Sequence, residues 1–339
     1  VIYTEGIHVK LDEKKAFHYF LLAANADHTE SQFIVGCIYL NSVVIPQDIK
    51  KAIYYFQLAA NKNNERALYN LGILFYDNKY ISRDINMAIK YFELSSKQDF
   101  VQAHVILGEI FYENKFVPRN IEKSIYYLEK AAKHNNIQAQ LMISTFYYEG
   151  IYITRDILKA IHYSRLASNQ NSSQGQFNLG ILYYNNKYIK RDANKAINYF
   201  TLAANQNHRE AQRILGYIYT EGVLVTRDIA KGISYYQKAA DNGELFAQCF
   251  LGEMYYNNIY VKRDIKKAIH YLKLSAEQND LRAQYDLGII YYEGKYIPRN
   301  IKKAIYFLSL SAKNYNNYAC LQLGFIYHEG KYIKKDIEK

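Results

Sequence analysis

The sequence predicts an all-α fold, a right-handed α/α solenoid of antiparallel helix pairs with a 36-residue period. First, eight of nine multiples of 36 are glycine and Ser144 is the exception: Gly36, Gly72, Gly108, Gly180, Gly216, Gly252, Gly288 and Gly324. Second, apolar residues recur at helical spacing between them, and third, no linker or insertion disturbs the register. We therefore predict one solenoid domain over 1–339, with partial repeats at 1–30 and 319–339 and eight full repeats over 31–318. Because the chain begins and ends within a repeat, we expect it to be an excerpt of a longer protein.

The first helix of each repeat, helix A, carries the periodic glycine. In one copy Ala67, Leu71, Leu74 and Phe75 fall at i, i+4, i+7 and i+8, which places them on one face of a helix. The position that ends helix A is mostly Gly or Asn, the residues that tolerate a left-handed C-cap. These positions are Gly6, Ser42, Asn78, Asn114, Gly150, Asn186, Gly222, Asn258, Gly294 and Gly330.

The second helix, helix B, begins six residues later at an Asp or Asn. Such residues accept a hydrogen bond from an unpaired backbone N–H and stabilise the helix by about 1 kcal/mol. The predicted N-caps are Asp12, Asp48, Asp84, Asn120, Asp156, Asp192, Asp228, Asp264, Asn300 and Asp336. Helix B then ends at a position rich in Asn, Asp and Gly, including Asn63, Asn135, Asn171, Asn207, Gly243 and Asn279.

The periodic glycine predicts a close helix contact. Glycine costs about 1 kcal/mol relative to alanine inside a helix, so its recurrence indicates a neighbour that leaves no room for a Cβ. The expected neighbours are Tyr19, Tyr55, Tyr91, Tyr127, Tyr163, Tyr199, Tyr235, Tyr271 and Phe307. We expect Ser144 to mark the tightest or most distorted contact of the series.

The repeat resembles the Sel1-like repeat, an α/α solenoid family related to tetratricopeptide repeats. One copy that carries most of the motif consists of Ala283, Leu287, Gly288, Tyr291, Gly294, Ile297, Lys303, Ala304, Phe307 and Ala312. The resemblance covers the whole chain. It departs from the family where a loop glycine is replaced by Tyr80, Phe116, Tyr152, Tyr188, Tyr260, Tyr296 and Tyr332. The cysteine pair found in some secreted members is also missing.

The resemblance implies that helix A lines a concave surface, so its face opposite the core is the predicted partner-binding groove. This face is rich in tyrosine, a common anchor at protein interfaces. The predicted groove residues are Tyr69, Tyr76, Glu109, Tyr112, Tyr148, Phe177, Tyr184, Arg213, Tyr217, Glu253, Tyr256, Tyr285 and Tyr292. Alternatively, these rings pack neighbouring A helices together. Glu109, Arg213 and Glu253 interrupt the apolar run and are the specificity candidates.

A second candidate surface, the basic edge, lies between helices A and B and carries much of the net charge of +11. Its arginines are Arg83, Arg119, Arg155, Arg191, Arg227, Arg263 and Arg299. Lysines follow just inside helix B, at Lys51, Lys123, Lys159, Lys195, Lys231, Lys267 and Lys303. Cations at a helix N-terminus oppose the helix dipole, so one hypothesis is an edge that docks an acidic protein surface. The alternative is a solvated edge held by Arg–Asp pairs.

No residue pattern indicates catalysis, a cofactor or a metal. The nine histidines do not form a metal-ligand spacing, and phosphate-binding and nucleophile motifs are missing. The three cysteines, Cys37, Cys249 and Cys320, favour a reducing, cytoplasmic compartment and are expected in or near the core. We expect no membrane span, because no stretch approaches the ~18 apolar residues that one needs.

The sequence thus predicts a non-catalytic interaction scaffold or adaptor with protein partners, within a larger assembly and without a small-molecule substrate. A second hypothesis is nucleic-acid binding by tyrosine and arginine, which the near-neutral groove disfavours. A third is a regulatory or targeting arm of a longer chain that contains an enzyme.

Overall fold

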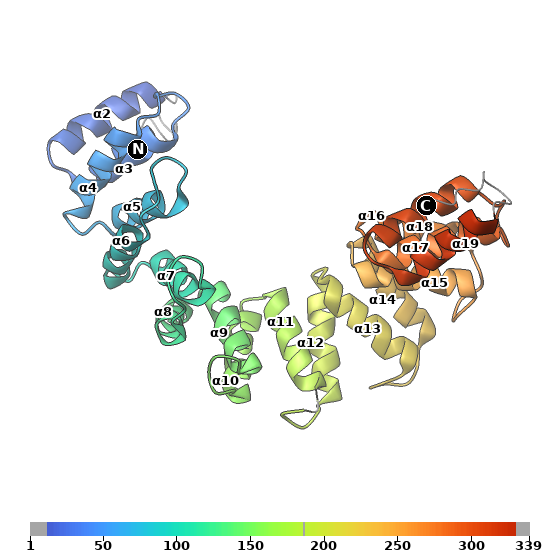
Figure 1. Ribbon diagram of the computed structural model, residues 1–339. Coiled ribbons are helices and arrows are strands. Elements are labelled where there is room, and N and C mark those ends of the chain that lie inside the picture. Colours follow the sequence, from blue (N-terminus) through green and yellow to red (C-terminus); the bar gives the residue numbers. More distant parts are fainter. Residues whose placement is uncertain (1–11, 186, 330–339) are drawn as a thin grey trace. The chain divides into compact units, whose positions relative to one another are not determined.

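The computed structural model describes residues 12–185 and 187–329. The chain forms two compact units, residues 1–170 and 171–339. Within each unit, consecutive antiparallel helix pairs lie side by side (Figure 1). The described part contains helices and no strand, as the sequence predicts. None of these helices has the length and apolar character that a membrane span requires.

Odd-numbered helices are helix A and even-numbered helices are helix B. In the first unit the helices are α2 (Glu13–Asn25), α3 (Thr29–Asn41), α4 (Ile49–Ala60), α5 (Glu65–Asp77), α6 (Ile85–Lys97), α7 (Val101–Glu113), α8 (Ile121–Lys133), α9 (Ile137–Glu149) and α10 (Ile157–Asn169). In the second unit they are α11 (Ser173–Tyr184), α12 (Ala193–Asn205), α13 (Arg209–Glu221), α14 (Ile229–Asp241), α15 (Leu245–Asn257), α16 (Ile265–Glu277), α17 (Leu281–Glu293), α18 (Ile301–Lys313) and α19 (Asn317–Glu329).

The caps of these helices follow the predicted series. Every predicted N-cap from Asp12 to Asn300 accepts a bond from the backbone N–H three residues later. Helix A ends in a left-handed residue at Asn78, Asn114, Gly150, Gly222, Asn258 and Gly294. Ser42 was expected to join this series, and that prediction is wrong: it is extended, with φ −68°. Its hydroxyl instead accepts from the N–H groups of Val44 and Ile45. Gly6, Asn186, Gly330, Tyr332 and Asp336 lie outside the described residues.

Seven of the periodic glycines, Gly324 being the exception, face a close neighbour among the described residues, but the predicted neighbour is wrong by one residue. A Cβ on Gly72 would lie 2.5 Å from Cε1 of Phe92, and one on Gly216 would lie 2.8 Å from Cγ of Tyr236. The series that fills this space is Phe56, Phe92, Leu128, Phe200, Tyr236, Leu272 and Leu308. The predicted and the observed residues are neighbours in helix B and both are apolar. The sequence alone therefore does not show which of the two turns toward the glycine.

The predicted tyrosines have a different role. Those from Tyr55 to Phe307 each stack on a ring of helix A in the same repeat, at 5.8–6.3 Å between centroids and 5–15° between planes. The pairs are Tyr39–Tyr55, Phe75–Tyr91, Phe111–Tyr127, Tyr147–Tyr163, Tyr183–Tyr199, Tyr219–Tyr235, Tyr255–Tyr271 and Tyr291–Phe307. Stacked rings contribute about 0.5–1.5 kcal/mol per pair beyond the area they bury.

Ser144 was expected to mark the tightest contact, and this prediction is also wrong. The residue that faces it is Ser164, not a ring or leucine. The two hydroxyl oxygens lie 2.6 Å apart, and Ser144 also donates to the carbonyl of Ala160 at 2.9 Å. Because two small residues meet here, the serine fits without distortion.

Candidate partner-binding surfaces

The predicted groove residues are half-buried, except for Tyr217, which is exposed. They are shared between the first unit (Tyr69 to Tyr148) and the second (Phe177 to Tyr292). One side of several of these rings packs against other side chains of the same unit. Tyr69, for example, lies 5.6 Å from Phe92 and 5.2 Å from Phe100 between centroids, and Phe177 lies 4.5 Å from His208. These rings therefore contribute to packing and still present part of their area to solvent.

The three charged groove residues each reach the start of the next A helix. Glu109 accepts from Gln138, and Arg213 forms an ion pair with Glu244 at 3.2 Å. Glu253 is held by Arg282. Burial raises the pKa of Glu109, and the nearby Glu113 raises it further. These residues tie adjacent repeats together, a role that sequence reasoning did not assign to them.

The second unit contains a pocket of about 270 Å³ between α15 and α17 on the predicted groove. Predicted groove residues from two adjacent repeats meet here, together with Asn257 and Asp286, which the sequence did not single out. The residues that carry its chemistry are Glu253, Tyr256, Asn257, Arg282, Tyr285 and Asp286. Nη2 of Arg282 donates to Oε2 of Glu253 at 2.6 Å, and Nε of Arg282 forms an ion pair with Oε1 of the same carboxylate.

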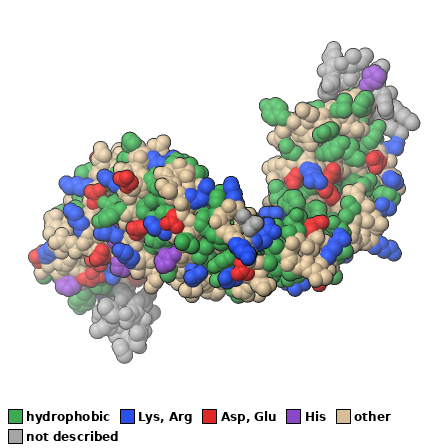
Figure 2. All heavy atoms as spheres, turned by 90° about the horizontal axis from the view of Figure 1, so that it is seen from below, with side chains coloured by type: hydrophobic (Ala, Val, Ile, Leu, Met, Phe, Trp, Pro, Cys, Tyr) green, Lys and Arg blue, Asp and Glu red, His purple; other side chains and the backbone are tan. Residues whose placement is uncertain are grey.

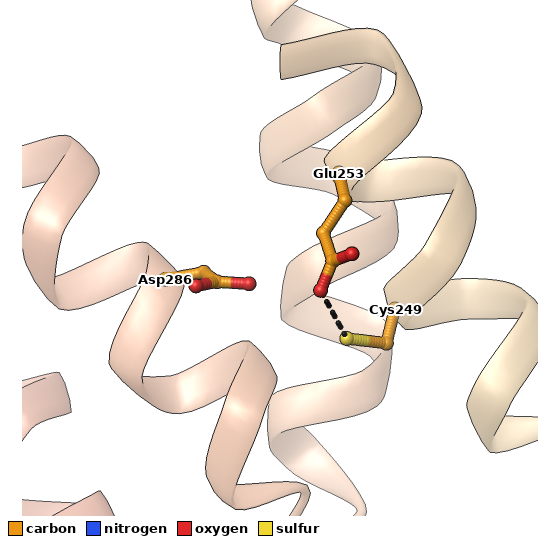
Figure 3. A group of neighbouring side chains, drawn as sticks. All are labelled: Cys249, Glu253 and Asp286. Atoms are coloured by element: carbon orange, nitrogen blue, oxygen red, sulfur yellow. Dashed lines mark hydrogen bonds between the residues drawn. The ribbon is translucent and has the colours of Figure 1, made fainter. Parts of the chain in front are cut away.

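Two carboxyl groups lie beside this pocket, those of Glu253 and Asp286. Arg282 pairs with the first, and the pKa of the second is raised. Figure 3 shows Cys249 and Glu253 on one helix, with Asp286 facing them from another. Within the described residues, this is the group of three potential metal ligands whose ligand atoms all lie within 4.8 Å. Burial raises the pKa of Asp286 to about 7, with repulsion from Glu253 adding to it, and burial also raises the pKa of the Cys249 thiol. Arg282 pairs with Glu253, and burial favours the protonated forms of Asp286 and of the Cys249 thiol.

Cys249 is the buried cysteine, 5% exposed, and its thiol donates to Glu253 at 3.5 Å. Cys37 is half-buried and Cys320 is exposed. The expectation that all three lie in or near the core is therefore wrong for Cys320.

The basic-edge arginines cap helix A and contact the following repeat. Nε of Arg83 donates to the carbonyl of Tyr76 at 2.6 Å, and its guanidinium lies 4.5 Å from the Phe116 centroid. Arg119 repeats the arrangement with Tyr112 and Tyr152, at 2.6 and 4.4 Å. The same carbonyl bond is made by Arg155, Arg191, Arg227 and Arg263, and the ring contact by Arg227 with Tyr260 and Arg263 with Tyr296.

This geometry corrects the electrostatic argument from the sequence. The guanidinium groups lie at the C-terminus of helix A, where a cation is favourable by about 0.3–1 kcal/mol. Arg83, Arg119, Arg227 and Arg263 bind carbonyls and rings, so the predicted Arg–Asp pairs are wrong for these four. The loop aromatics that depart from the family motif are their stacking partners.

The lysines of the same edge cover the stacked rings of helix A. Their ammonium groups lie 4.1–5.2 Å from a ring centroid, within the range of a cation–π contact. They are Lys51, Lys123, Lys159, Lys195, Lys231, Lys267 and Lys303. Lys51 and Lys195 also pair with the N-cap aspartates of their helices.

The sequence matches the Sel1 repeat model over ten consecutive segments, 1–28, 29–64, 65–100, 101–136, 137–172, 173–208, 209–244, 245–280, 281–316 and 317–339. The chain belongs to the Sel1 repeat family. Sel1 repeat proteins are generally protein-interaction scaffolds.

Two solved structures are similar to this Sel1 repeat protein. A Sel1 repeat protein from Oxalobacter formigenes is 26% identical, with a TM-score of 0.80 over 91% of this chain and 89% of its own. The protein c5321, a protective antigen of uropathogenic Escherichia coli strains with an SLR fold, is also 26% identical, with a TM-score of 0.76 over 99% of this chain and 72% of its own. No curated protein matches the sequence.

Proposed function

We propose that this Sel1 repeat protein is a non-catalytic adaptor that binds partner proteins through its groove residues and its basic edge. The observation that carries the proposal is the pocket between α15 and α17, where Tyr256 and Tyr285 from adjacent repeats flank a polar floor. Pockets that combine aromatic walls with a few polar groups suit a partner's anchoring side chain. The free cysteines support a reducing compartment such as the cytoplasm.

The groove is tested by site-specific photocrosslinking in the source cells. A photoreactive amino acid replaces Tyr285 in one variant and Tyr306, an exposed helix B residue of the same unit, in a matched control. The proposal expects a discrete crosslinked protein at 285 and not at 306. Equal labelling at both positions would contradict a binding role for the groove.

The basic edge supports a partner with an acidic surface, because its arginines are exposed and pre-ordered by stacking. In Arg83 and Arg119 the carbonyl bond uses Nε, which leaves the η nitrogens for a carboxylate. Basic and acidic side chains alternate on the face that Figure 2 shows. We expect the edge to select its partner by pairing individual guanidinium groups with carboxylates.

A neutral edge variant tests this part of the proposal. Gln47 occupies the arginine position in an earlier repeat and donates to the same type of carbonyl at 2.6 Å. Arg83→Gln with Arg119→Gln should therefore preserve the cap and remove two charges. We expect weaker binding to poly-L-glutamate, a probe for an acidic protein surface, than in the control Lys97→Gln with Lys133→Gln. If the arginine variant and the lysine control bind poly-L-glutamate equally, the edge arginines have a structural role and do not bind the partner.

A further inference from the structure

Amide pairs, each made of one buried and one exposed glutamine, connect consecutive repeats in both units. In the first unit, Gln140 donates to the carbonyl of Ala132 at 3.2 Å and accepts from Gln170 at 2.9 Å, thirty residues later. In the second unit, the same spacing joins Gln176 to Gln206 and Gln248 to Gln278, each at 2.8 Å. This amide position is thus a regular feature of the core.

The helix pair α7–α8 has two histidines in place of this amide pair. His104 takes the first position and His134 the second, and their rings lie 6.5 Å apart with 18° between planes. His104 is 0% exposed, and its Nδ1 lies 2.9 Å from the hydroxyl of Ser96. Its Nε2 is also buried and has no hydrogen-bond partner, which is costly for a buried polar atom.

A carboxylate lies opposite this unsatisfied nitrogen. Oδ1 of Asp99 is 3.6 Å from Nε2 of His104, too far for a hydrogen bond. A zinc ion bonded to an imidazole and a carboxylate, with bonds of about 2.0–2.2 Å and a tetrahedral angle, separates the two ligand atoms by about 3.4 Å. The observed separation therefore leaves the width of one ion between the two atoms.

We propose that His104, Asp99 and His134 form a binding site for a divalent transition-metal ion, of which Zn²⁺ is the best fit. His104 and Asp99 form the fixed part, while the exposed ring of His134 turns to supply the third ligand. Water completes the tetrahedron. Two imidazoles and a carboxylate are a ligand set that zinc accepts.

The surroundings prepare His104 to act as a ligand. Burial lowers the pKa of His104, and the charge of Lys130 lowers it further, so the imidazole stays neutral despite the opposing effect of Asp99. When Nδ1–H donates to Ser96, the lone pair of Nε2 faces Asp99. A second hydrogen bond of this kind fixes the tautomer and orientation of metal-binding histidines.

Asp99 is held in place by its backbone. It has a φ of +56° at the end of α6, and most equivalent positions of other repeats carry Asn, with Asp27, Gly243 and Tyr315 at the others. Its side chain is 72% exposed, which gives an ion access to the buried nitrogen. The site would bridge the segment after α6, helix α7 and the C-cap of α8.

The test is a titration of the full chain with Zn²⁺ alone, measured by calorimetry, with Co²⁺ absorption as a report on tetrahedral coordination. The decisive variant is His104→Gln with His134→Gln, because it restores the amide pair of the neighbouring repeats and is expected to fold. We expect one site in the parent chain and an affinity about tenfold lower or weaker still in the variant.

A second variant excludes adventitious binding by surface histidines. His18→Gln, His162→Gln and His270→Gln together remove three exposed histidines that lie on other helices. This variant should retain the site and the Co²⁺ spectrum. Retained binding in the His104/His134 variant, or a parent chain with no saturable site, would overturn the proposal.

Discussion

The pairs α5–α6 and α9–α10 occupy equivalent places in the first unit but meet through opposite contacts. In α5–α6, Gly72 leaves space that the ring of Phe92 fills. In α9–α10, Ser144 and Ser164 meet through a hydrogen bond inside the core. The comparison teaches that the repeat fixes the shape of the helix contact and not its chemistry, provided that both sides change together.

The largest expected loss of stability comes from removing the ring of Phe92 from its contact with Gly72. Phe92→Ala should lower the free energy of unfolding by about 3–5 kcal/mol, because it removes a fully buried ring and leaves a cavity. Gly72→Ser together with Phe92→Ser copies the α9–α10 contact and should be less destabilising than the sum of the single changes. Urea unfolding of the parent chain, Gly72→Ser, Phe92→Ser and the double variant gives the coupling energy between the two positions. Strict additivity would show that the serine pair gains nothing from its partner.

A smaller effect is expected from adding a methyl group at the glycine. Gly72→Ala should destabilise by about 1–3 kcal/mol, because the Cβ would lie 2.5 Å from Phe92. Gly324→Ala is the matched control, since no residue that the structure describes lies within 4 Å of its Cβ. It should stabilise α19 by up to about 1 kcal/mol through helix propensity. Thermal unfolding that shifts in the same direction for both variants would exclude ring contact as the reason for the glycine.

The smallest effect concerns a polar contact in the second unit, that of Glu253 with Asp286. The pKa of Asp286 is raised to about 7 from an ordinary value of 3.8, so the folded chain binds more protons than the unfolded chain between these pH values. Its contribution to stability is therefore full below pH 4 and is lost as the pH rises through 7. Asp286→Asn should remove this pH-dependent loss, because an amide does not titrate.

Urea midpoints at pH 5 and pH 8, compared between the parent and Asp286→Asn, measure that difference directly. Other titrating groups, such as Glu109 and His104, are present in both proteins and cancel. The variant should be the more stable of the two at pH 8. An equal difference at both pH values would mean that the pKa of Asp286 is ordinary.

Much of the local structure could be predicted because it depends on neighbouring residues. The aspartate N-caps and the left-handed Asn and Gly C-caps need only a short stretch of chain to form. The groove pocket could be predicted only in part. Glu253, Tyr256 and Tyr285 follow from the helix A face, whereas Asp286, the chain neighbour of Tyr285 in α17, was not among the predicted groove residues. The histidine pair was missed, although the thirty-residue spacing of Gln140 and Gln170 would have indicated it.

The sequence by itself determined the repeat, the helix pairs and the Sel1 family, because a 36-residue pattern of glycine, caps and apolar faces admits one stacking arrangement. Tertiary structure decided which helix B residue packs against each of these glycines. The predicted and the observed positions are neighbours in the chain and both are apolar, so only the packing of the helices selects one. It also decided what the arginines contact. Arg83 looks like a solvated charge in the sequence, but its partners are a carbonyl seven residues earlier and a ring in the next repeat. Such contacts depend on the relative placement of whole helices, which no local pattern specifies.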